Sequence, residues 1–157
     1  MSVTTPAGRL VSAFGDVEKM AALYAPEIEW SLSASLPYPR PMKGQEAVIA
    51  FNRSVWEDVY FPDCSVEILD EIGGEALSAV RFIYRARYRA SSLPYENEYT
   101  LFARGGLGGI REVFEALDTL AIFDGGLAGD VGIGTGTQPL GDLVAELEHG
   151  LGGYPLE

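Results

Sequence analysis

The stretch from residue 65 to residue 120 constrains the fold most, because it reads as a succession of strands joined by tight turns. Apolar and polar residues alternate along most of it, which is the period of a strand with one buried face. Glycine pairs at Gly73-Gly74 and Gly105-Gly106 fall where hairpin turns are expected. The predicted strands cover residues 65–72, 76–90, 95–104 and 109–120. Consecutive strands with short connections favour an antiparallel sheet.

The first 60 residues differ from this stretch because they carry helix signals. Thr5-Pro6 and Asp16 are each suited to the start of a short helix. Residues 45–59 place apolar side chains at helical spacing, and residues 27–33 alternate as a strand does. Helices followed by a run of strands predict an α+β fold, in which a curved antiparallel sheet wraps around N-terminal helices.

Charge and rare residue types exclude several functions. A formal net charge of -12 disfavours nucleic acid and anionic membranes as partners, because both present negative phosphates. Cys64 is the only cysteine and His149 the only histidine, so we expect no metal site, and we predict no other cofactor. The sequence has neither a long apolar run nor the apolar core of a signal peptide. The predicted location is the cytoplasm.

Along residues 76–90, apolar side chains alternate with basic ones, so one face of the predicted strand is apolar and the other is basic. Arg81, Arg85, Arg87 and Arg89 alternate with apolar side chains, so we expect the arginines on the outer face of the sheet. There they would pair with acidic residues of neighbouring strands. The alternative is a binding site for an anionic ligand.

Glu115 stands out in the last predicted strand because it lies on the same face of the strand as the apolar residues Val113 and Leu117. If that parity faces inward, burial disfavours the charged carboxylate and raises its pKa. A carboxyl group tuned in this way suits a general acid or base near neutral pH. The alternative is an exposed glutamate at a sheet edge, and the residues alone leave both open.

Five short segments carry a resemblance to a known family. They are residues 16–24 (DVEKMAALY), 28–30 (IEW), 43–47 (KGQEA), 95–99 (YENEY) and 109–119. In order and spacing they resemble a SnoaL-like domain of the nuclear-transport-factor-2-like (ketosteroid-isomerase-like) superfamily. The resemblance implies a cone-shaped α+β barrel with one deep pocket.

On this resemblance, residues 1–123 form the SnoaL-like domain, and residues 124–157 form a glycine-rich extension with a short helix. Within the superfamily the motifs are most similar to those of the phenazine-biosynthesis A/B proteins. Trp56 with Phe61-Pro62-Asp63 resembles the end of a helix in those proteins, and Tyr95-Glu96-Asn97 resembles the start of a strand.

The resemblance also implies site residues. Glu115 aligns with the family's catalytic glutamate and would be the general acid or base. Glu98 would be a second carboxylate near it, and Arg53, at the position of a functional histidine in the phenazine proteins, would stabilise an oxyanion. The residues expected to bind substrate are Trp30, Tyr38, Trp56, Glu57, Tyr84, Thr100, Val113 and Leu117.

These expectations favour a cofactor-independent acid–base enzyme of the isomerase, cyclase or dehydratase type. Its substrate would be a hydrophobic, oxygenated small molecule of secondary metabolism. Two alternatives stay open, a non-catalytic small-molecule-binding module of the same fold and an epoxide hydrolase. The resemblance further implies a homodimer.

Overall fold

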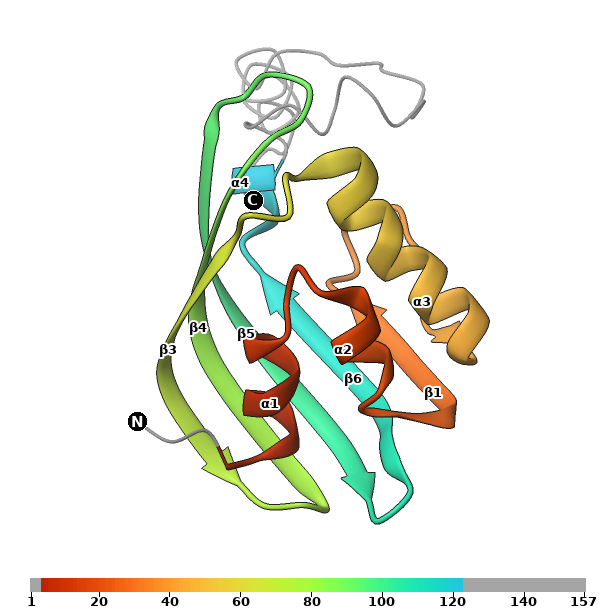
Figure 1. Ribbon diagram of the computed structural model, residues 1–157. Helices are drawn as coiled ribbons and strands as arrows, with labels where there is room; N and C mark the ends of the chain where they lie inside the picture. The colour runs from red at the N-terminus through yellow and green to blue at the C-terminus, as the bar shows by residue number, and fades with distance from the viewer. Residues whose placement is uncertain (1–3, 123–157) are drawn as a thin grey trace, which may run out of the picture. The chain divides into compact units, whose positions relative to one another are not determined.

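One six-stranded sheet carries the structure, with the strand order β2-β1-β6-β5-β4-β3. The computed structural model describes residues 4–122, so the predicted extension at 124–157 and its helix lie outside the described residues. The strands are β1 (Tyr24–Leu32), β2 (Met42–Lys43), β3 (Ser65–Gly73), β4 (Leu77–Arg87), β5 (Pro94–Gly106) and β6 (Gly109–Leu117). The helices and the curved sheet confirm the predicted α+β fold (Figure 1).

The sheet is mixed, which corrects the prediction that it is antiparallel. Strands β3 to β6 form the expected antiparallel succession, but β1 lies parallel to β6, with Trp30 opposite Val113 and Leu32 opposite Glu115. No hairpin joins β1 to β6, so the connection does not impose an antiparallel direction. The short strand β2, which was not predicted, pairs with the outer edge of β1.

The helices lie on one face of the sheet (Figure 1). They are α1 (Pro6–Ser12), α2 (Val17–Ala21) and α3 (Gln45–Ser54), and a short α4 (Thr119–Ile122) follows β6. The predicted caps are confirmed, because the side chain of Thr5 accepts a hydrogen bond from Gly8 N and that of Asp16 accepts one from Lys19 N, each at 3.1 Å. These bonds satisfy backbone donors that a helix start leaves unpaired.

The predicted helix over residues 45–59 is only partly α-helical. After α3 the chain widens into a π-helical turn, η1 (Val55–Val59), in which Tyr60 N donates to Val55 O at 2.8 Å. Arg89 stabilises this turn, because its guanidinium group donates to the backbone oxygens of Trp56 and Tyr60. Such turns occur mostly as single insertions within helices, frequently at functional sites.

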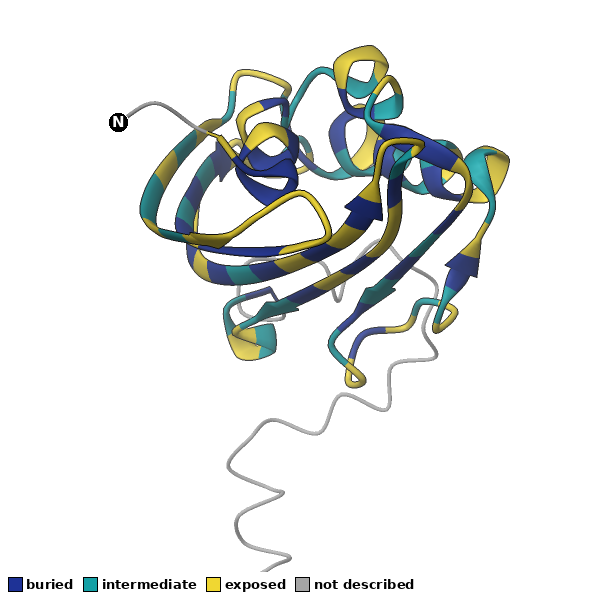
Figure 2. Cartoon of the chain, turned by 90° about the horizontal axis from the view of Figure 1, so that it is seen from below, coloured by how far each residue is buried: buried dark blue, intermediate teal, exposed yellow. Residues whose placement is uncertain are grey.

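Alternating burial along β4 and β5 gives the sheet two different faces (Figure 2). The inner face packs against the helices through large apolar side chains such as Phe82 and Leu101, both fully buried. The hairpin between β5 and β6 depends on Gly109, whose φ is +101°. A Cβ atom there would lie 2.8 Å from Ala25 N, so a larger residue would push β1 away.

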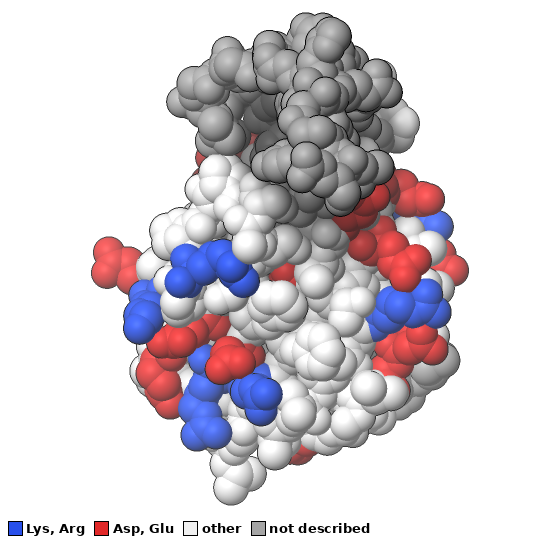
Figure 3. Space-filling view, turned by 180° about the vertical axis from the view of Figure 1, so that it is seen from behind, with Lys and Arg blue, Asp and Glu red and all other residues white. Residues whose placement is uncertain are grey.

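The outer face carries the predicted arginine stripe (Figure 3). Arg81 pairs with Asp70 at 2.7 Å and with Glu98 at 3.0 Å. Arg85 pairs with Glu67 and Glu96, and Arg87 pairs with Asp63. Pairing with acidic residues of neighbouring strands is therefore confirmed for Arg81 and Arg85. Asp63, the partner of Arg87, lies before β3, and Arg89 donates to the backbone of η1 and Tyr60. Figure 3 shows the charges in groups of both signs with uncharged surface between them.

Candidate functional site

A cavity of about 70 Å³ lies between the inner face of the sheet and the segment α3–η1. Most of its lining is apolar, and the exceptions are one carboxyl group and three tyrosines. The lining residues are Leu32, Leu36, Tyr38, Phe51, Val55, Val59, Tyr60, Tyr99, Glu115, Leu117 and Ile122. An apolar hollow with a few polar groups is the usual form of a small-molecule site.

Glu115 is the acidic residue of this cavity, and strand β6 directs it inward. Its register places it between Leu101 of β5 and Leu32 of β1, and its exposed fraction is 6%. Trp30 Nε1 donates a hydrogen bond to Glu115 Oε2 at 3.1 Å. No other hydrogen bond from residues 4–122 reaches this carboxyl group. The inward orientation that the resemblance implied is thus confirmed.

The environment of Glu115 raises the pKa of its carboxyl group to about 7. The cause is desolvation by burial, which disfavours the charged form, while the hydrogen bond from Trp30 lowers the pKa by a smaller amount. No arginine or lysine of the described residues pairs with Glu115 to offset the burial. At neutral pH this group can therefore either accept a proton or give one up.

Trp30 was predicted to bind substrate, but it does not line the cavity. Its indole N–H instead binds the carboxyl group of Glu115. Its side chain is 1% exposed and packs against Tyr24 and Phe51, with ring centroids 6.2 and 6.1 Å away. These contacts hold the indole N–H towards Glu115. The hydrogen bond from Trp30 to Oε2 therefore fixes the orientation of the Glu115 carboxyl group.

Four predicted site residues lie away from this cavity. Glu98 and Thr100 point to the outer face, because they have the opposite strand parity to Tyr99 and Leu101. Glu98 pairs with Arg81, so the expected pair of neighbouring carboxylates, Glu98 and Glu115, does not form.

The other two predicted site residues that lie away from the cavity are Arg53 of α3 and Glu57 of η1, which face the solvent. Arg53 pairs with Glu18 at 2.7 Å and is half-exposed, and Glu57 is exposed. An ion pair of Arg53 with Glu57 or Glu115 is therefore absent from the described residues, and Arg53 does not reach the cavity.

The remaining predicted residues lie on the inner side. Tyr38 and Leu117 line the cavity, as expected. Val113 is buried on the same face of β6 as Glu115. Trp56 and Tyr84 are core residues bound to each other, because Trp56 Nε1 donates to the Tyr84 hydroxyl at 2.9 Å. They lie behind the cavity rather than on its wall.

The sequence reasoning missed the tyrosines that accompany Glu115. Tyr60 and Tyr99 line the cavity, and the hydroxyls of Tyr99 and Tyr95 are 2.8 Å apart. Asn97 lies between them on the same face and donates to the Tyr95 hydroxyl at 2.8 Å. The alternation in YENEY placed these three on one face, but nothing local showed that the face is the inner one.

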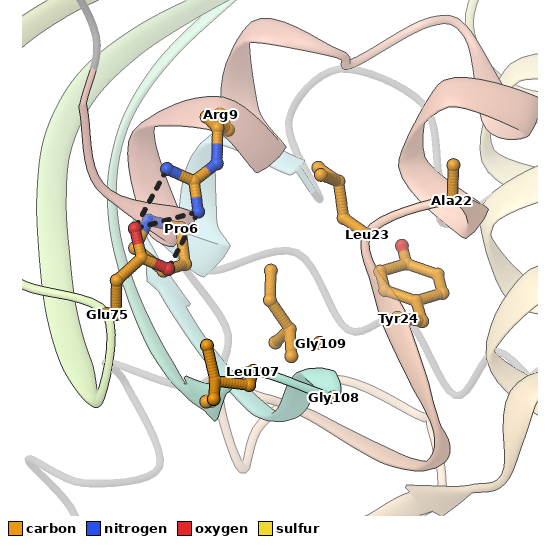
Figure 4. A pocket seen from close by; sticks show the side chains of 12 residues that line it. Pro6, Arg9, Ala22, Leu23, Tyr24, Glu75, Leu107, Gly108 and Gly109 are labelled. Carbon is orange, nitrogen blue, oxygen red and sulfur yellow. Dashed lines mark hydrogen bonds and ion pairs between the residues drawn. The ribbon is translucent and has the colours of Figure 1, made fainter.

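A second hollow, of about 450 Å³, lies beside α1 and the β5–β6 hairpin (Figure 4). It is larger than the Glu115 cavity, and exposed residues of the hairpin such as Leu107 line it. Its charged residues, Arg9 and Glu75, are largely exposed and already paired at 3.0 Å (Figure 4). No buried carboxyl group of the described residues lines it, so we assign the chemistry to the smaller cavity.

Residues 4–122 contain neither a cluster of metal ligands nor a membrane-spanning helix. No group of three or more His, Cys, Asp or Glu residues there could hold a metal ion. Cys64 is half-buried and its thiol donates to Phe14 O at 3.4 Å, which is a packing role. No helix in the described part is long and apolar enough to cross a membrane.

Three solved structures illustrate the fold match. A candidate SnoaL-like polyketide cyclase from Jannaschia sp. has a TM-score of 0.63 at 14% identity, covering 80% of this chain and 94% of that chain. A candidate isomerase from Rhodopseudomonas palustris has a TM-score of 0.62 at 18% identity, covering 76% and 91%. A protein with a ketosteroid isomerase-like fold from Catenulispora acidiphila, in complex with trimethylamine, has a TM-score of 0.57 at 14% identity, covering 71% and 85%.

At these identities the structural likeness establishes the fold and leaves the activity to the site. A search of the functionally curated proteins found no match. The model of the SnoaL-like domain family matches residues 9–113, which is well over half of the chain. With its six-stranded curved sheet and inward carboxyl group, this chain belongs to the SnoaL-like domain family and has the nuclear-transport-factor-2-like fold.

Proposed function

We propose that this protein is an acid–base enzyme in which Glu115 transfers protons on a hydrophobic, oxygenated small molecule without a cofactor. The observation that supports this most is one buried carboxyl group with a pKa of about 7 in an otherwise apolar cavity. Catalytic acids and bases work best when their pKa lies near the operating pH. The substrate class follows from the lining, which offers apolar contacts and tyrosine hydroxyls.

The geometry favours a single carboxyl group that both takes and returns a proton. Trp30 holds Oε2 at 3.1 Å, so Oε1 is the oxygen without a hydrogen bond from the described residues. A C–H or O–H bond of the substrate would break, with its proton moving to this oxygen and its electron pair staying on the substrate. Return of the proton to another atom would complete an isomerisation, and to a leaving hydroxyl a dehydration.

The same proton transfer serves a cyclase. The electron pair left on carbon would form a C–C bond to a carbonyl carbon of the same substrate, the C=O π bond would open, and the resulting alkoxide would take the proton back from Glu115. Structural neighbours described as candidate isomerases and a candidate polyketide cyclase support this range of reactions. We therefore propose the isomerase, cyclase or dehydratase class, in secondary metabolism. The likeness to the phenazine-biosynthesis A/B proteins remains a prediction, and the exposed position of Arg53 gives it no support from the site.

A titration of Glu115 tests this proposal without a known substrate. The protein is labelled with ¹³C at glutamate side-chain carboxyl groups, and the signal that disappears in Glu115→Gln is assigned to Glu115. We expect this signal to titrate with a pKa near 7, while Glu98, assigned through Glu98→Gln, serves as the exposed control. A Glu115 signal that titrates near the model-peptide value of about 4.3 would contradict the proposal.

The second candidate function is a non-catalytic binding module. The observation that favours it is that no second carboxylate, histidine, lysine or arginine of the described residues lines the cavity to assist Glu115. An ordinary pKa for Glu115 would support this alternative, as would bound ligands that are released unchanged. An epoxide hydrolase is the third alternative. Glu115 would take a proton from a water molecule whose oxygen attacks one epoxide carbon, the ring C–O bond would break, and return of the proton to the ring oxygen would give a diol.

A further inference from the structure

Asn52 is a polar residue on the buried side of α3, where an apolar side chain is expected. It is 1% exposed and lies on the same face of the helix as Val48, which is fully buried. Its Oδ1 accepts a hydrogen bond from the hydroxyl of Tyr24 in β1 at 2.6 Å. Asn52 does not line the Glu115 cavity, so the proposed chemistry gives it no role. Burying an amide group costs free energy unless it is hydrogen-bonded, so its place in the core calls for an explanation.

Two residues of α3 hold Tyr24 at its two ends. Gln45 Nε2 donates to Tyr24 O at 3.2 Å, and Asn52 binds the hydroxyl of the same residue. Gln45 and Asn52 are about two turns apart on the helix, so they face the same side. Burial raises the pKa of Tyr24 well above its usual value, and the charge of Glu115 adds to this rise. The hydroxyl therefore keeps its proton near neutral pH and donates it to Asn52.

An irregularity in β1 brings Tyr24 beside Trp30. The partners of these two residues on β6 are Ile110 and Val113, which are closer together in the sequence than Tyr24 and Trp30 are. The register shifts between Tyr24 and Glu29, as it does at a β-bulge, and bulges change the direction of side chains. The rings of Tyr24 and Trp30 meet edge to face, with centroids 6.2 Å apart. Tyr24 therefore restricts the orientation of the Trp30 indole.

The orientation of Trp30 in turn fixes Glu115, because Trp30 Nε1 donates to Glu115 Oε2 at 3.1 Å. Phe51, the neighbour of Asn52 in α3, packs against the same indole with centroids 6.1 Å apart. This hydrogen bond from Trp30 favours the charged carboxylate against the effect of burial. The other ionisable groups of the described residues that interact with Glu115 are tyrosine hydroxyls, those of Tyr24, Tyr38, Tyr95 and Tyr99.

We propose that Asn52 is a positioning residue of this site, which holds Tyr24 against Trp30 and thereby keeps the indole N–H directed at Glu115. Asn52 acts through these two side chains and does not contact the substrate. The inference rests on the proposed function and deepens it, because it adds a support for the acid that begins on the helix α3.

The indole N–H signals of the tryptophans report on this series of contacts. The sequence has only Trp30 and Trp56, so a ¹H–¹⁵N NMR spectrum of the full chain shows two indole signals, and the one that disappears in Trp56→Phe belongs to Trp56. We expect the Trp30 signal of wild type to shift with pH at the pKa of Glu115, because its N–H binds that carboxyl group. The Trp56 N–H binds the Tyr84 hydroxyl, so its signal should stay in place.

Asn52→Leu removes the acceptor of the Tyr24 hydroxyl and keeps a side chain of similar length. We expect it to reduce the pH-dependent shift of the Trp30 signal and to raise the pKa of Glu115 by about 0.5, the effect of a weakened hydrogen bond to the carboxylate. Tyr24→Phe should have the same effect, and the double variant should have no larger one, because both changes break one bond. Tyr24→Phe, the milder change, carries the test if Asn52→Leu does not fold.

The matched control is Ser78→Ala, which removes another buried polar contact. Ser78 is also 1% exposed, and its Oγ accepts from Ala7 N at 3.0 Å. Ser78→Ala should lower the free energy of unfolding but leave the Trp30 signal and the pKa of Glu115 unchanged. A purely structural role of Asn52 would make Asn52→Leu resemble this control.

Three results would overturn the inference. The first is a Trp30 signal in wild type that does not follow the titration of Glu115. The second is a Trp30 signal in Asn52→Leu and Tyr24→Phe that behaves as in wild type. The third is a fall in the pKa of Glu115 in either variant, because the carboxylate would then be better stabilised without the bond between Asn52 and Tyr24.

The inference and the proposed function can fail separately. If Glu115 titrates near the model-peptide value of about 4.3 while both variants still weaken the response of the Trp30 signal, the inference stands and the acid–base function falls. If Glu115 has a pKa near 7 but neither variant changes the Trp30 signal, the function stands and the inference falls.

Discussion

Glu115 and Glu98 are the same residue type in adjacent strands, yet they lie on opposite faces of one sheet. Glu98 is exposed on the outer face and pairs with Arg81 at 3.0 Å. Glu115 is buried on the inner face, with a tryptophan N–H as its hydrogen-bond partner and a pKa of about 7. The alternation of side chains along each strand therefore decides the environment of these two glutamates. One face supplies solvated ion pairs, and the other supplies a desolvated acid.

The largest expected effect is a loss of turnover when Glu115, but not Glu98, loses its carboxyl group. Glu115→Gln removes the group that transfers protons while keeping its shape, so turnover of an identified substrate should fall about 100-fold or more. Glu98→Gln, the matched change on the outer face, should leave turnover within about twofold. Steady-state kinetics of the two variants checks this. Equal losses in both variants would mean that the faces do not differ in the way proposed.

The next effect concerns stability against pH. The folded state raises the pKa of Glu115 from 4.5 to about 7, so it binds the proton more tightly than the unfolded state does. This contribution is fully present below pH 4.5 and is lost as the pH rises through about 7. The loss amounts to about 3 kcal/mol for a shift of this size.

Glu115→Gln should therefore lack this decline between pH 5 and pH 8, whereas Glu98→Gln should follow wild type. Urea unfolding at the two pH values measures the free energy of unfolding in each protein. Parallel pH dependence in wild type and Glu115→Gln would show that burial does not perturb this carboxyl group.

A smaller effect tests the hydrogen bond behind Glu115. Trp30→Phe removes the N–H that stabilises the carboxylate, so the pKa of Glu115 should rise by about 1. Trp56→Phe is the control, since its N–H binds Tyr84 and not Glu115. The ¹³C titration resolves the change. An unaltered pKa in Trp30→Phe would leave Trp30 with a packing role only.

The smallest effect is expected on the outer face. Arg81→Ala breaks two ion pairs, to Asp70 and Glu98, but all three side chains are about half-exposed. Such pairs contribute about 1 kcal/mol or less, and salt screens them. The free energy of unfolding of Arg81→Ala and wild type should therefore converge in 1 M salt. A difference that persists there would indicate packing of the arginine stem.

The outer face also bears on the expected homodimer, which stays a prediction. The arginine stripe is paired within the chain, so it offers few free charges to a partner. Light scattering at low and high salt would distinguish an electrostatic dimer interface, which salt weakens, from an apolar one. A dimer that survives high salt would point to uncharged parts of the surface, such as the exposed pair Phe102 and Phe114.

Sequence periodicity predicted much of the fold for local reasons. The caps at Thr5 and Asp16, the hairpins at glycine pairs and the alternation along β4 and β5 each depend on residues close together in the chain. The parallel pairing of β1 with β6 was missed because its partners are about 80 residues apart. The π-helical turn was missed because its apolar spacing also fits an α-helix.

For the site, the residues that share a face of the sheet could be predicted from the sequence, because side chains along a strand alternate with a period of two. The alternation grouped Glu115 with Val113 and Leu117, and Glu98 with Thr100. Only the tertiary structure decided which face became the inside, since that depends on where the helices pack. The same packing buried Glu115 and raised its pKa, left Arg53 in solvent, and brought Tyr60, which follows η1, beside Tyr88 and Tyr95.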